Sequence, residues 1–103
     1  MAVKVVVERR VIPGQEKRAL ELLRAIRVRC LEEPGYLSGE TLRDSEDAQT
    51  IIVISSWFGL GDWRRWHASV ERRGFETKLR PMLTAPERVR VFVEGLSDIH
   101  SGA

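Results

Sequence analysis

Hydrophobic and polar positions alternate at the start of the chain, over Val3–Arg10. Alternate valines of this segment share one face, and mainly charged residues take the other. Such a period of two in β-branched residues predicts a half-buried strand. Arg9 continues the valine face, where a guanidinium group needs a charged partner or the mouth of a cavity. Alternatively, Arg9 is close enough to the end of the strand for its head group to reach solvent.

Helical spacing replaces this alternation from Glu16 to about Glu33, where apolar residues recur three and four positions apart. That spacing places them on one face of a helix. Pro34 and Gly35 are expected to end the helix, because proline has no amide hydrogen and glycine tolerates the turn that follows. The apolar face consists of Ala19, Leu22, Leu23, Ile26 and Cys30.

Two further strands are predicted at Tyr36–Arg43 and Thr50–Phe58. The first alternates loosely, whereas the second is rich in β-branched residues and ends with two aromatic rings. A polar segment at 44–49 separates them. The two strands should therefore form an antiparallel hairpin.

A helix and a last strand are predicted in the second half of the chain. Apolar residues from Trp63 onward follow helical spacing until Gly74, and a further helical turn or two should reach Met82. Pro81 should curtail or bend these last turns. Arg88–Glu94 then alternates as a strand again.

This order of elements, β-α-β-β-α-β, predicts an α+β fold of the ferredoxin-like type, in which helices cover one face of a four-stranded antiparallel sheet. We expect one domain over residues 1–96 and a flexible tail at 97–103. The opposite sheet face carries Val6, Phe92 and the apolar residues of Ile51–Ile54, which is too much apolar surface to leave in water. The simplest cover is a second copy of the chain, which predicts a homodimer through this sheet face.

Composition narrows the class of protein. The chain has 103 residues, of which 43% are hydrophobic, and its formal net charge is only +2, far below that of a dedicated nucleic-acid binder. No apolar run approaches the roughly 20 residues that cross a bilayer, and the N-terminus lacks the pattern of a signal peptide. Neither a nucleic acid nor a membrane is an expected partner. The single cysteine, Cys30, cannot form an internal disulfide and fits a reducing, cytoplasmic compartment.

Familiar catalytic motifs for nucleotide, zinc and acyl-transfer chemistry are absent from the sequence. Its two histidines cannot build a multi-histidine metal site within one chain, so no metal is expected. Arginines are common, and four of them flank one short segment, which we interpret as a solvated helix face. These four are Arg64, Arg65, Arg72 and Arg73.

All three tryptophans lie within residues 57–66. Trp66 and His67 follow Trp63 by three and four positions, which puts them on a helix stripe facing the sheet. An indole N–H and a neutral imidazole there could meet a flat, polar-edged ligand, with His67 as general base because its ordinary pKa lies near neutrality. Simple packing of these residues at the core is the structural alternative. Tyr36, after the Pro-Gly turn, could present its phenol at the end of the sheet.

Four features of the sequence occur together in one known family: Glu8-Arg9-Arg10, Glu33-Pro34-Gly35-Tyr36, the acidic turn Asp44–Asp47, and the pair Trp57 and Trp66. On these features the sequence resembles the antibiotic biosynthesis monooxygenase family over about Val3–Glu94. The resemblance implies a dimeric α+β barrel, in which two sheets close face to face and each subunit keeps a pocket between its own sheet and helices. It also implies oxidation of electron-rich phenols or hydroquinones by dioxygen with no cofactor.

The resulting hypothesis is a small monooxygenase for a planar phenolic or quinol-type aromatic ligand. Its candidate catalytic residue is His67, and its candidate substrate-binding residues are Trp66, Trp63, Arg9 and Tyr36.

Two other functions stay open. One is a non-catalytic ligand-binding or interaction module on the same barrel, because family membership does not by itself confer activity. The other, a minor alternative, is haem degradation. In that branch of the family an asparagine, a tryptophan and a histidine form the site. Trp66 matches the tryptophan, but Arg9 takes the asparagine position, and Glu76 or Leu79 takes the histidine position. Many quinol-type members have a histidine at the position of Trp66.

Overall fold

The computed structural model of the protein describes residues 1–94, so the predicted tail lies outside the described residues. Within residues 1–94, seven helices and strands and one short 3-10 helix follow the order β-α-β-β-α-α-β, which confirms the predicted ferredoxin-like fold. No helix within residues 1–94 is long and apolar enough to span a membrane. The elements are β1 (Val3–Arg10), α1 (Glu16–Cys30), β2 (Tyr36–Arg43), β3 (Thr50–Trp57), α2 (Leu60–His67), α3 (Val70–Leu79), η1 (Arg80–Met82) and β4 (Arg88–Val93).

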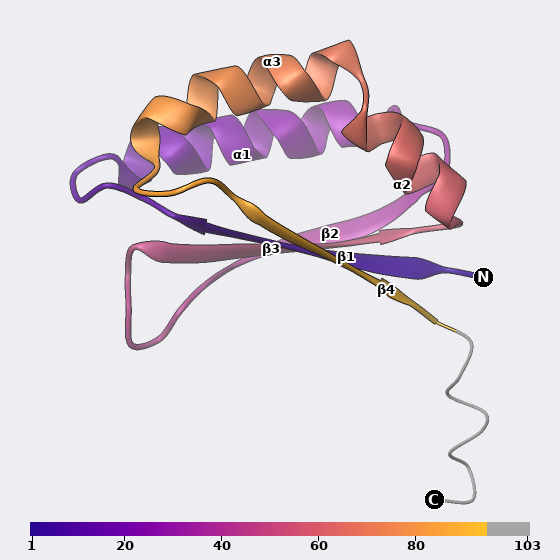
Figure 1. Ribbon diagram of the computed structural model, residues 1–103, viewed down its shortest axis with the longest axis horizontal. Helices are drawn as coiled ribbons and strands as arrows, with labels where there is room; N and C mark the ends of the chain where they lie inside the picture. Colours follow the sequence, from indigo (N-terminus) through magenta and orange to yellow (C-terminus); the bar gives the residue numbers. More distant parts are fainter. Residues whose placement is uncertain (95–103) are drawn as a thin grey trace, which may run out of the picture.

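The sheet is antiparallel with strand order β2-β3-β1-β4, and all of its helices lie on one side (Figure 1). Val3 of β1 pairs with Trp57 of β3 and with Val93 of β4. Directly paired residues of antiparallel strands point to the same side of a sheet. The alternate valines of β1 therefore share the helix-covered face, called the inner face below, with Trp57. The opposite face is called the outer face.

Two clusters of buried side chains fill the space between the inner face and the helices. One joins the valines of β1 to Cys30 and to all three tryptophans. The other surrounds Ile51 of β3 and Leu79 of α3. The three tryptophans are each at most 5% exposed, so all of them belong to the core.

Helix α1 ends at Cys30 rather than near Glu33. The amides of Glu32 and Glu33 donate to the carbonyls of Arg29 and Cys30, which is the tighter 3-10 pattern. Gly35 then turns the chain with a φ of +84°, and a Cβ at this position would overlap the side chain of Asp62. Glycine therefore allows the turn before β2 and the close approach of α2 at the same position.

The second helical segment breaks at Ser69, so the prediction that its first helix runs to Gly74 is wrong. The Ser69 hydroxyl donates to the carbonyl oxygen of Trp66 at 2.7 Å and accepts the Arg72 amide at 3.1 Å. Ser69 thereby closes α2 and caps α3. Gly74 lies inside α3 with open space around it. Pro81 curtails α3 as predicted, because the chain continues past Leu79 only as η1.

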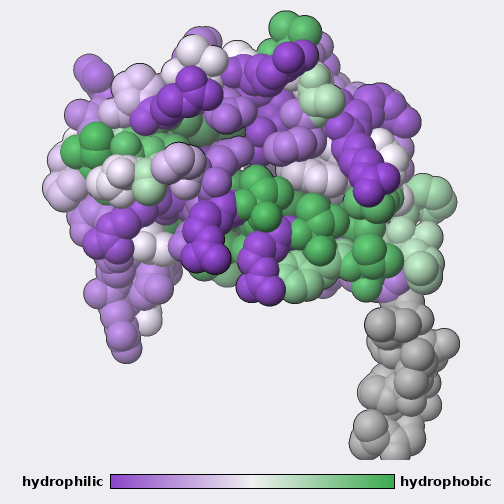
Figure 2. Space-filling model, in the orientation of Figure 1, coloured by the Kyte–Doolittle hydropathy of each residue, from purple (hydrophilic) through white to green (hydrophobic). Residues whose placement is uncertain are grey.

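Apolar side chains remain exposed on both faces of the sheet. On the outer face Leu42 and Phe92 are each 44% exposed. On the inner face Val91 and Val93 of the edge strand β4 are 38% and 48% exposed, and Figure 2 shows hydrophobic side chains gathered over this strand. The half-buried apolar residues of the outer face include Val6, Ile52 and Ile54.

Candidate functional site

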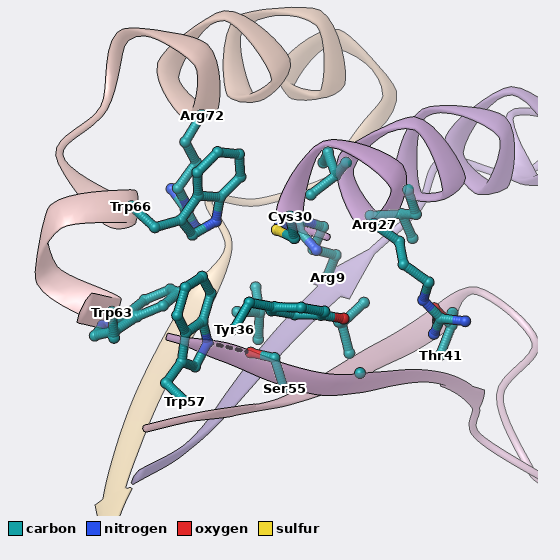
Figure 3. Close-up of a pocket in the computed structure, with 15 residues that line it drawn as sticks. Arg9, Arg27, Cys30, Tyr36, Thr41, Ser55, Trp57, Trp63, Trp66 and Arg72 are labelled. Atoms are coloured by element: carbon teal, nitrogen blue, oxygen red, sulfur yellow. Dashed lines mark hydrogen bonds between the residues drawn. The ribbon is translucent and has the colours of Figure 1, made fainter. Parts of the chain in front are cut away.

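A small cavity, called the inner cavity, lies between the inner face of the sheet and the helices. Its volume is about 50 Å³. A cavity needs roughly 10–15 Å³ to hold one water molecule. The inner cavity therefore has room for a diatomic molecule or a few waters but not for an aromatic ring system. Its aromatic and charged lining includes Tyr36, Trp57, Trp63, Trp66, Arg9 and Arg72 (Figure 3).

Edge-to-face contacts fix the aromatic wall of this cavity. The ring centroids of Tyr36 and Trp57 are 5.2 Å apart, and those of Trp57 and Trp63 are 5.8 Å apart. The indole N–H of Trp57 donates to the hydroxyl of Ser55 at 3.0 Å, which satisfies its only polar group (Figure 3). Such rings favour this geometry because the edge of one carries positive partial charge and the face of the other negative.

Tyr36 is the first residue of β2, and the register of the pairing between β2 and β3 shifts between Tyr36 and Ser38. Its hydroxyl rests over Gly39, where any Cβ would overlap it. Burial raises the pKa of Tyr36 above its ordinary value, so the phenol is neutral at physiological pH. Tyr36 can therefore donate a hydrogen bond into the cavity but cannot serve there as a base.

A buried ion cluster closes one side of the inner cavity. Nε and Nη2 of Arg9 donate to Oε2 of Glu87 at 3.0 and 2.8 Å, and Nη2 of Arg72 donates to Oε1 at 2.7 Å. The side chains of Arg9, Arg72 and Glu87 are 7%, 6% and 11% exposed. Arg9 thus has the charged partner that its face predicts, and the alternative that its head group reaches solvent is wrong.

The ion cluster pairs two buried guanidinium groups with one buried carboxylate, and the more exposed carboxylate of Glu76 balances its charge. Burial lowers the pKa of Arg9, and the nearby charge of Arg72 adds to this, although Glu87 opposes both. For Glu87, burial acts to raise the pKa, but the charges and hydrogen bonds of the two guanidinium groups outweigh it and lower the pKa overall. Glu76 is a weaker partner, 3.6 Å from Nη1 of Arg72 and half-exposed. One well-held carboxylate therefore serves two guanidinium groups.

A larger hollow, called the outer cleft, opens on the other side of the ion cluster. Its volume is about 510 Å³, and His67, Glu76 and Glu87 line it together with the apolar residues Leu79 and Val89. Its lining includes Glu87, whereas that of the inner cavity includes Arg9 and Arg72. The ion cluster is thus a partition between the two hollows.

His67 belongs to the outer cleft and Trp66 to the inner cavity, so the structure does not bring these two predicted residues together. The His67 ring stacks on Trp63 with centroids 5.1 Å apart. Partial burial, followed by the charge of Arg72, lowers the pKa of His67 below its ordinary value. Its imidazole is therefore neutral at pH 7 and able to accept a proton from a molecule in the cleft.

Four of the five candidate residues, Arg9, Tyr36, Trp63 and Trp66, line the inner cavity together, whereas His67 lines the outer cleft. The sequence pattern does not reveal the buried partners Arg72 and Glu87. The interpretation of four arginines as a solvated face holds for the three exposed ones but is wrong for Arg72. Its position, seven residues before the buried Leu79 and hence on the same helix face, is the signal that could have revealed it.

Cys30 also lines the inner cavity, and burial raises the pKa of its thiol to about 12. The thiol is protonated at neutral pH, so Cys30 is not a nucleophile in this environment. Within residues 1–94 no cluster of three or more histidine, cysteine or acidic residues could hold a metal ion.

Comparisons with known proteins agree with the fold. The family model for antibiotic biosynthesis monooxygenase matches residues 2–78, whereas no curated protein matches the chain. A conserved protein from Methanosarcina mazei Go1 superposes with a TM-score of 0.86 at 16% identity, covering 92% of this chain and 94% of its own. SnoaB, a cofactor-independent oxygenase from Streptomyces nogalater, superposes with a TM-score of 0.81 at 19% identity, covering 91% of this chain and 93% of its own. Rv0793 from Mycobacterium tuberculosis superposes with a TM-score of 0.83 at 16% identity, covering 92% of this chain and 96% of its own.

Proposed function

The chain belongs to the antibiotic biosynthesis monooxygenase family, and we propose that it is a cofactor-independent monooxygenase for a planar phenolic or quinol-type aromatic substrate. One observation carries the proposal: a ring-sized cleft and a diatomic-sized cavity meet at a buried cluster that holds two guanidinium groups. A fold shared with a cofactor-independent oxygenase supports it.

The aromatic substrate binds in the outer cleft. At about 510 Å³ this hollow lies within the range of about 300–1,000 Å³ that small-molecule sites occupy. The inner cavity is an order of magnitude smaller, at about 50 Å³. Leu79, Leu83 and Val89 supply apolar surface for the ring, and the charged groups of the cleft stand at its edges.

His67 accepts the phenolic proton. Its imidazole lines the cleft, is partly accessible, and has a lowered pKa that keeps it neutral at pH 7. Removing the proton creates an electron-rich phenolate, which is the form that reacts with dioxygen. Arg9 and Arg72 stabilise the negative charge, and their burial strengthens that interaction because little water screens it.

Dioxygen occupies the inner cavity, where Trp63, Trp66 and Tyr36 supply apolar walls. These three residues thus bind the second substrate, and opening of the ion cluster brings it to the edge of the ring. One electron passes from the phenolate to dioxygen and gives superoxide, whose charge the same two guanidinium groups stabilise. Coupling of the two radicals forms a peroxide on the ring.

The reaction balances without a reductant. When the carbon para to the phenol carries hydrogen, the ring loses four electrons and becomes a quinone. One oxygen atom of dioxygen becomes the new carbonyl, and the other leaves as water with the protons of the phenol and of that carbon. The protein needs only to bind, orient and move a proton, which matches the residues that surround the two hollows.

A second copy of the chain covers the outer face of the sheet. Leu42 and Phe92 are exposed there beside Val6, Ile52 and Ile54, and no helix in the part of the chain that the structure describes covers them. Burial of such a face in a symmetric homodimer removes this apolar surface from water. Sedimentation equilibrium tests the dimer, and a mass near the 11.8 kDa of one chain at micromolar concentration would contradict it.

A panel of a quinol, a flavonoid, an anthrone and haem tests the proposed activity. Quenching of the tryptophan fluorescence identifies ligands, and each ligand is then incubated with ¹⁸O₂ while oxygen uptake is recorded. We expect uptake with one ¹⁸O atom in the product of a phenolic ligand. Binding without uptake would instead indicate a non-catalytic binding module, and consumption of haem would indicate haem degradation.

A further inference from the structure

The partition between the two hollows has the form of a binding site for a carboxylate, and Glu87 fills that site. Each oxygen of the Glu87 carboxylate is held by a different guanidinium group, Oε2 by Arg9 and Oε1 by Arg72. A phenolate has a single oxygen and cannot bridge both arginines in this way. A carboxylate has two oxygens in one plane and matches the planar, multidentate guanidinium groups.

Arg9 and Arg72 are held more firmly in the fold than Glu87, the carboxylate that binds them both. Arg9 lies on a central strand and Arg72 on a helix, and both are almost fully buried. Glu87 belongs to the segment that precedes β4, in which Thr84, Ala85 and Pro86 are exposed. Glu87 also lines the outer cleft, so a ligand in the cleft contacts its side chain directly.

A ligand that displaces Glu87 must itself be an anion. Removing one partner from a buried ion pair leaves an uncompensated charge, which is strongly unfavourable. Within residues 1–94, the loss of Glu87 would leave Arg72 with the half-exposed carboxylate of Glu76 as its ion-pair partner and Arg9 with none. A neutral ring cannot replace Glu87, whereas a ring that bears a carboxylate can.

We propose that the substrate is an aromatic hydroxy acid, whose carboxylate displaces Glu87 from Arg9 and Arg72 while its ring lies in the outer cleft. This inference rests on the proposed function and narrows its substrate class. Displacement of Glu87 also joins the two hollows, because the ion cluster is what divides them. The ring hydroxyl next to the carboxylate then lies on the side of the cleft that His67 occupies.

Calorimetric titration of three matched ligands tests the inference. The ligands are 1-hydroxynaphthalene-2-carboxylate, the corresponding neutral carboxamide, and naphthalen-1-ol. In the Glu87→Gln variant no internal carboxylate competes for the arginines. We expect this variant to bind the carboxylate at least about tenfold more tightly than the parent protein does, the size of a charged hydrogen bond, and to bind both neutral ligands as the parent does.

Two further variants keep the test decisive. Glu87→Asp retains the charge but is too short to reach both arginines, so it should fold and still bind the carboxylate more tightly than the parent. Glu71→Gln is the matched control, because it removes the same charge from an exposed position of α3 that pairs with Arg29. It should leave all three affinities unchanged. An equal gain for the carboxylate and the carboxamide, or no gain in either Glu87 variant, would overturn the inference.

Oxygen uptake, measured separately, distinguishes this inference from the proposed function. A gain in affinity that is specific to the carboxylate, with no uptake for any ligand, would support the carboxylate site and contradict the monooxygenase. Oxidation of naphthalen-1-ol as fast as of the hydroxy acid, with no carboxylate-specific gain, would support the monooxygenase and contradict the carboxylate site.

Discussion

The inner cavity and the outer cleft differ in size, walls and charge although a single ion cluster separates them. The inner cavity, about 50 Å³, is bounded by aromatic rings and guanidinium groups, whereas the outer cleft, about 510 Å³, presents His67 and the carboxylates of Glu76 and Glu87. The proton acceptor and the space for a diatomic molecule are therefore on opposite sides of the partition. The difference indicates that the two reactants approach from different sides and meet at Arg9 and Arg72.

The two hollows also differ in the parts of the chain that form them. Regular elements supply most of the wall of the inner cavity, including β1, β3 and α2. Much of the outer cleft comes from η1 and the irregular segment 83–87 that follows it. Irregular exposed segments open at lower free energy than core elements do. We therefore expect the partition to open from the side of the cleft.

Loss of the charge pairing in the ion cluster should have the largest effect on the free energy of unfolding. Glu87→Leu leaves Arg9 and Arg72 buried without their main partner, and we expect it to lower the free energy of unfolding by about 3–5 kcal/mol. Urea unfolding followed by tryptophan fluorescence measures this. The triple variant Arg9→Met, Arg72→Met, Glu87→Leu replaces the three buried charges with apolar groups and should unfold near the parent midpoint. An equally unstable triple variant would show that packing, rather than charge pairing, holds the partition.

Acid should break the same partition. The pKa of Glu87 is lower in the folded protein than its ordinary value of 4.5, so the unfolded state binds the proton more readily. The stabilisation is therefore fully present above pH 4.5 and is lost as the pH falls through the lowered pKa. Urea midpoints of the parent should fall more steeply below pH 4.5 than those of the triple variant. Parallel curves would contradict the role of Glu87.

Removing His67, the proton acceptor in the outer cleft, should lower turnover while the inner cavity stays intact. We expect His67→Ala to reduce kcat by about 10²-fold or more with an identified substrate, the size of a lost general base. Because burial lowers the pKa of His67 below 6.5, kcat/KM of the parent should rise with pH through that lowered value and be level at pH 7. Arg64→Ala, an exposed change on the same helix, is the control. Parent-like turnover by His67→Ala would place the proton acceptor elsewhere.

A substitution at Gly39, under the Tyr36 hydroxyl, should have a smaller effect on the free energy of unfolding. Gly39→Ala forces a Cβ against the Tyr36 hydroxyl, and we expect a loss of about 1–3 kcal/mol in the free energy of unfolding. Tyr36→Phe removes that hydroxyl, so the double variant should recover most of the loss. A double-mutant cycle measures the coupling, which additive effects of the two substitutions would contradict.

The smallest effect on the free energy of unfolding is expected at Ser69, where α2 and α3 meet. Ser69→Ala removes the cap of α3 and should lower the free energy of unfolding by about 1 kcal/mol. Thr77→Ala is the matched control, because it removes a hydroxyl bonded to the carbonyl of Arg73 within the exposed part of the same helix. Thermal or urea unfolding of the two variants side by side measures the difference. Equal stability would show that Ser69 is not needed to separate α2 from α3.

Local periodicity was sufficient to predict the fold. The alternation of Val3–Arg10 and Tyr36–Arg43 matches the observed strands residue for residue. The break between α2 and α3 was placed wrongly because Gly74 is the stronger local signal, whereas the cap at Ser69 depends on a hydroxyl that also bonds to Trp66. Periodicity fixes which face a residue takes, but a helix break depends on side-chain bonds that periodicity does not describe.

The site was predicted only in part, for two physical reasons. Trp66 and His67 are adjacent in sequence, and adjacent residues of a helix point in different directions, so one helix stripe could not hold both. Glu87 lies 78 residues from Arg9, and no pattern near Glu87 marks it as a partner. Arg9, in contrast, was found because strand alternation alone places its guanidinium on the buried face.

A crystal structure of the complex with 1-hydroxynaphthalene-2-carboxylate, determined under xenon pressure, most directly tests the division between the two hollows. Xenon is a probe for small apolar cavities and stands in for dioxygen. We expect the naphthalene ring in the outer cleft beside His67 and xenon in the inner cavity among Trp63, Trp66 and Tyr36. A ring seated among the tryptophans of the inner cavity, with xenon excluded from it, would contradict the division.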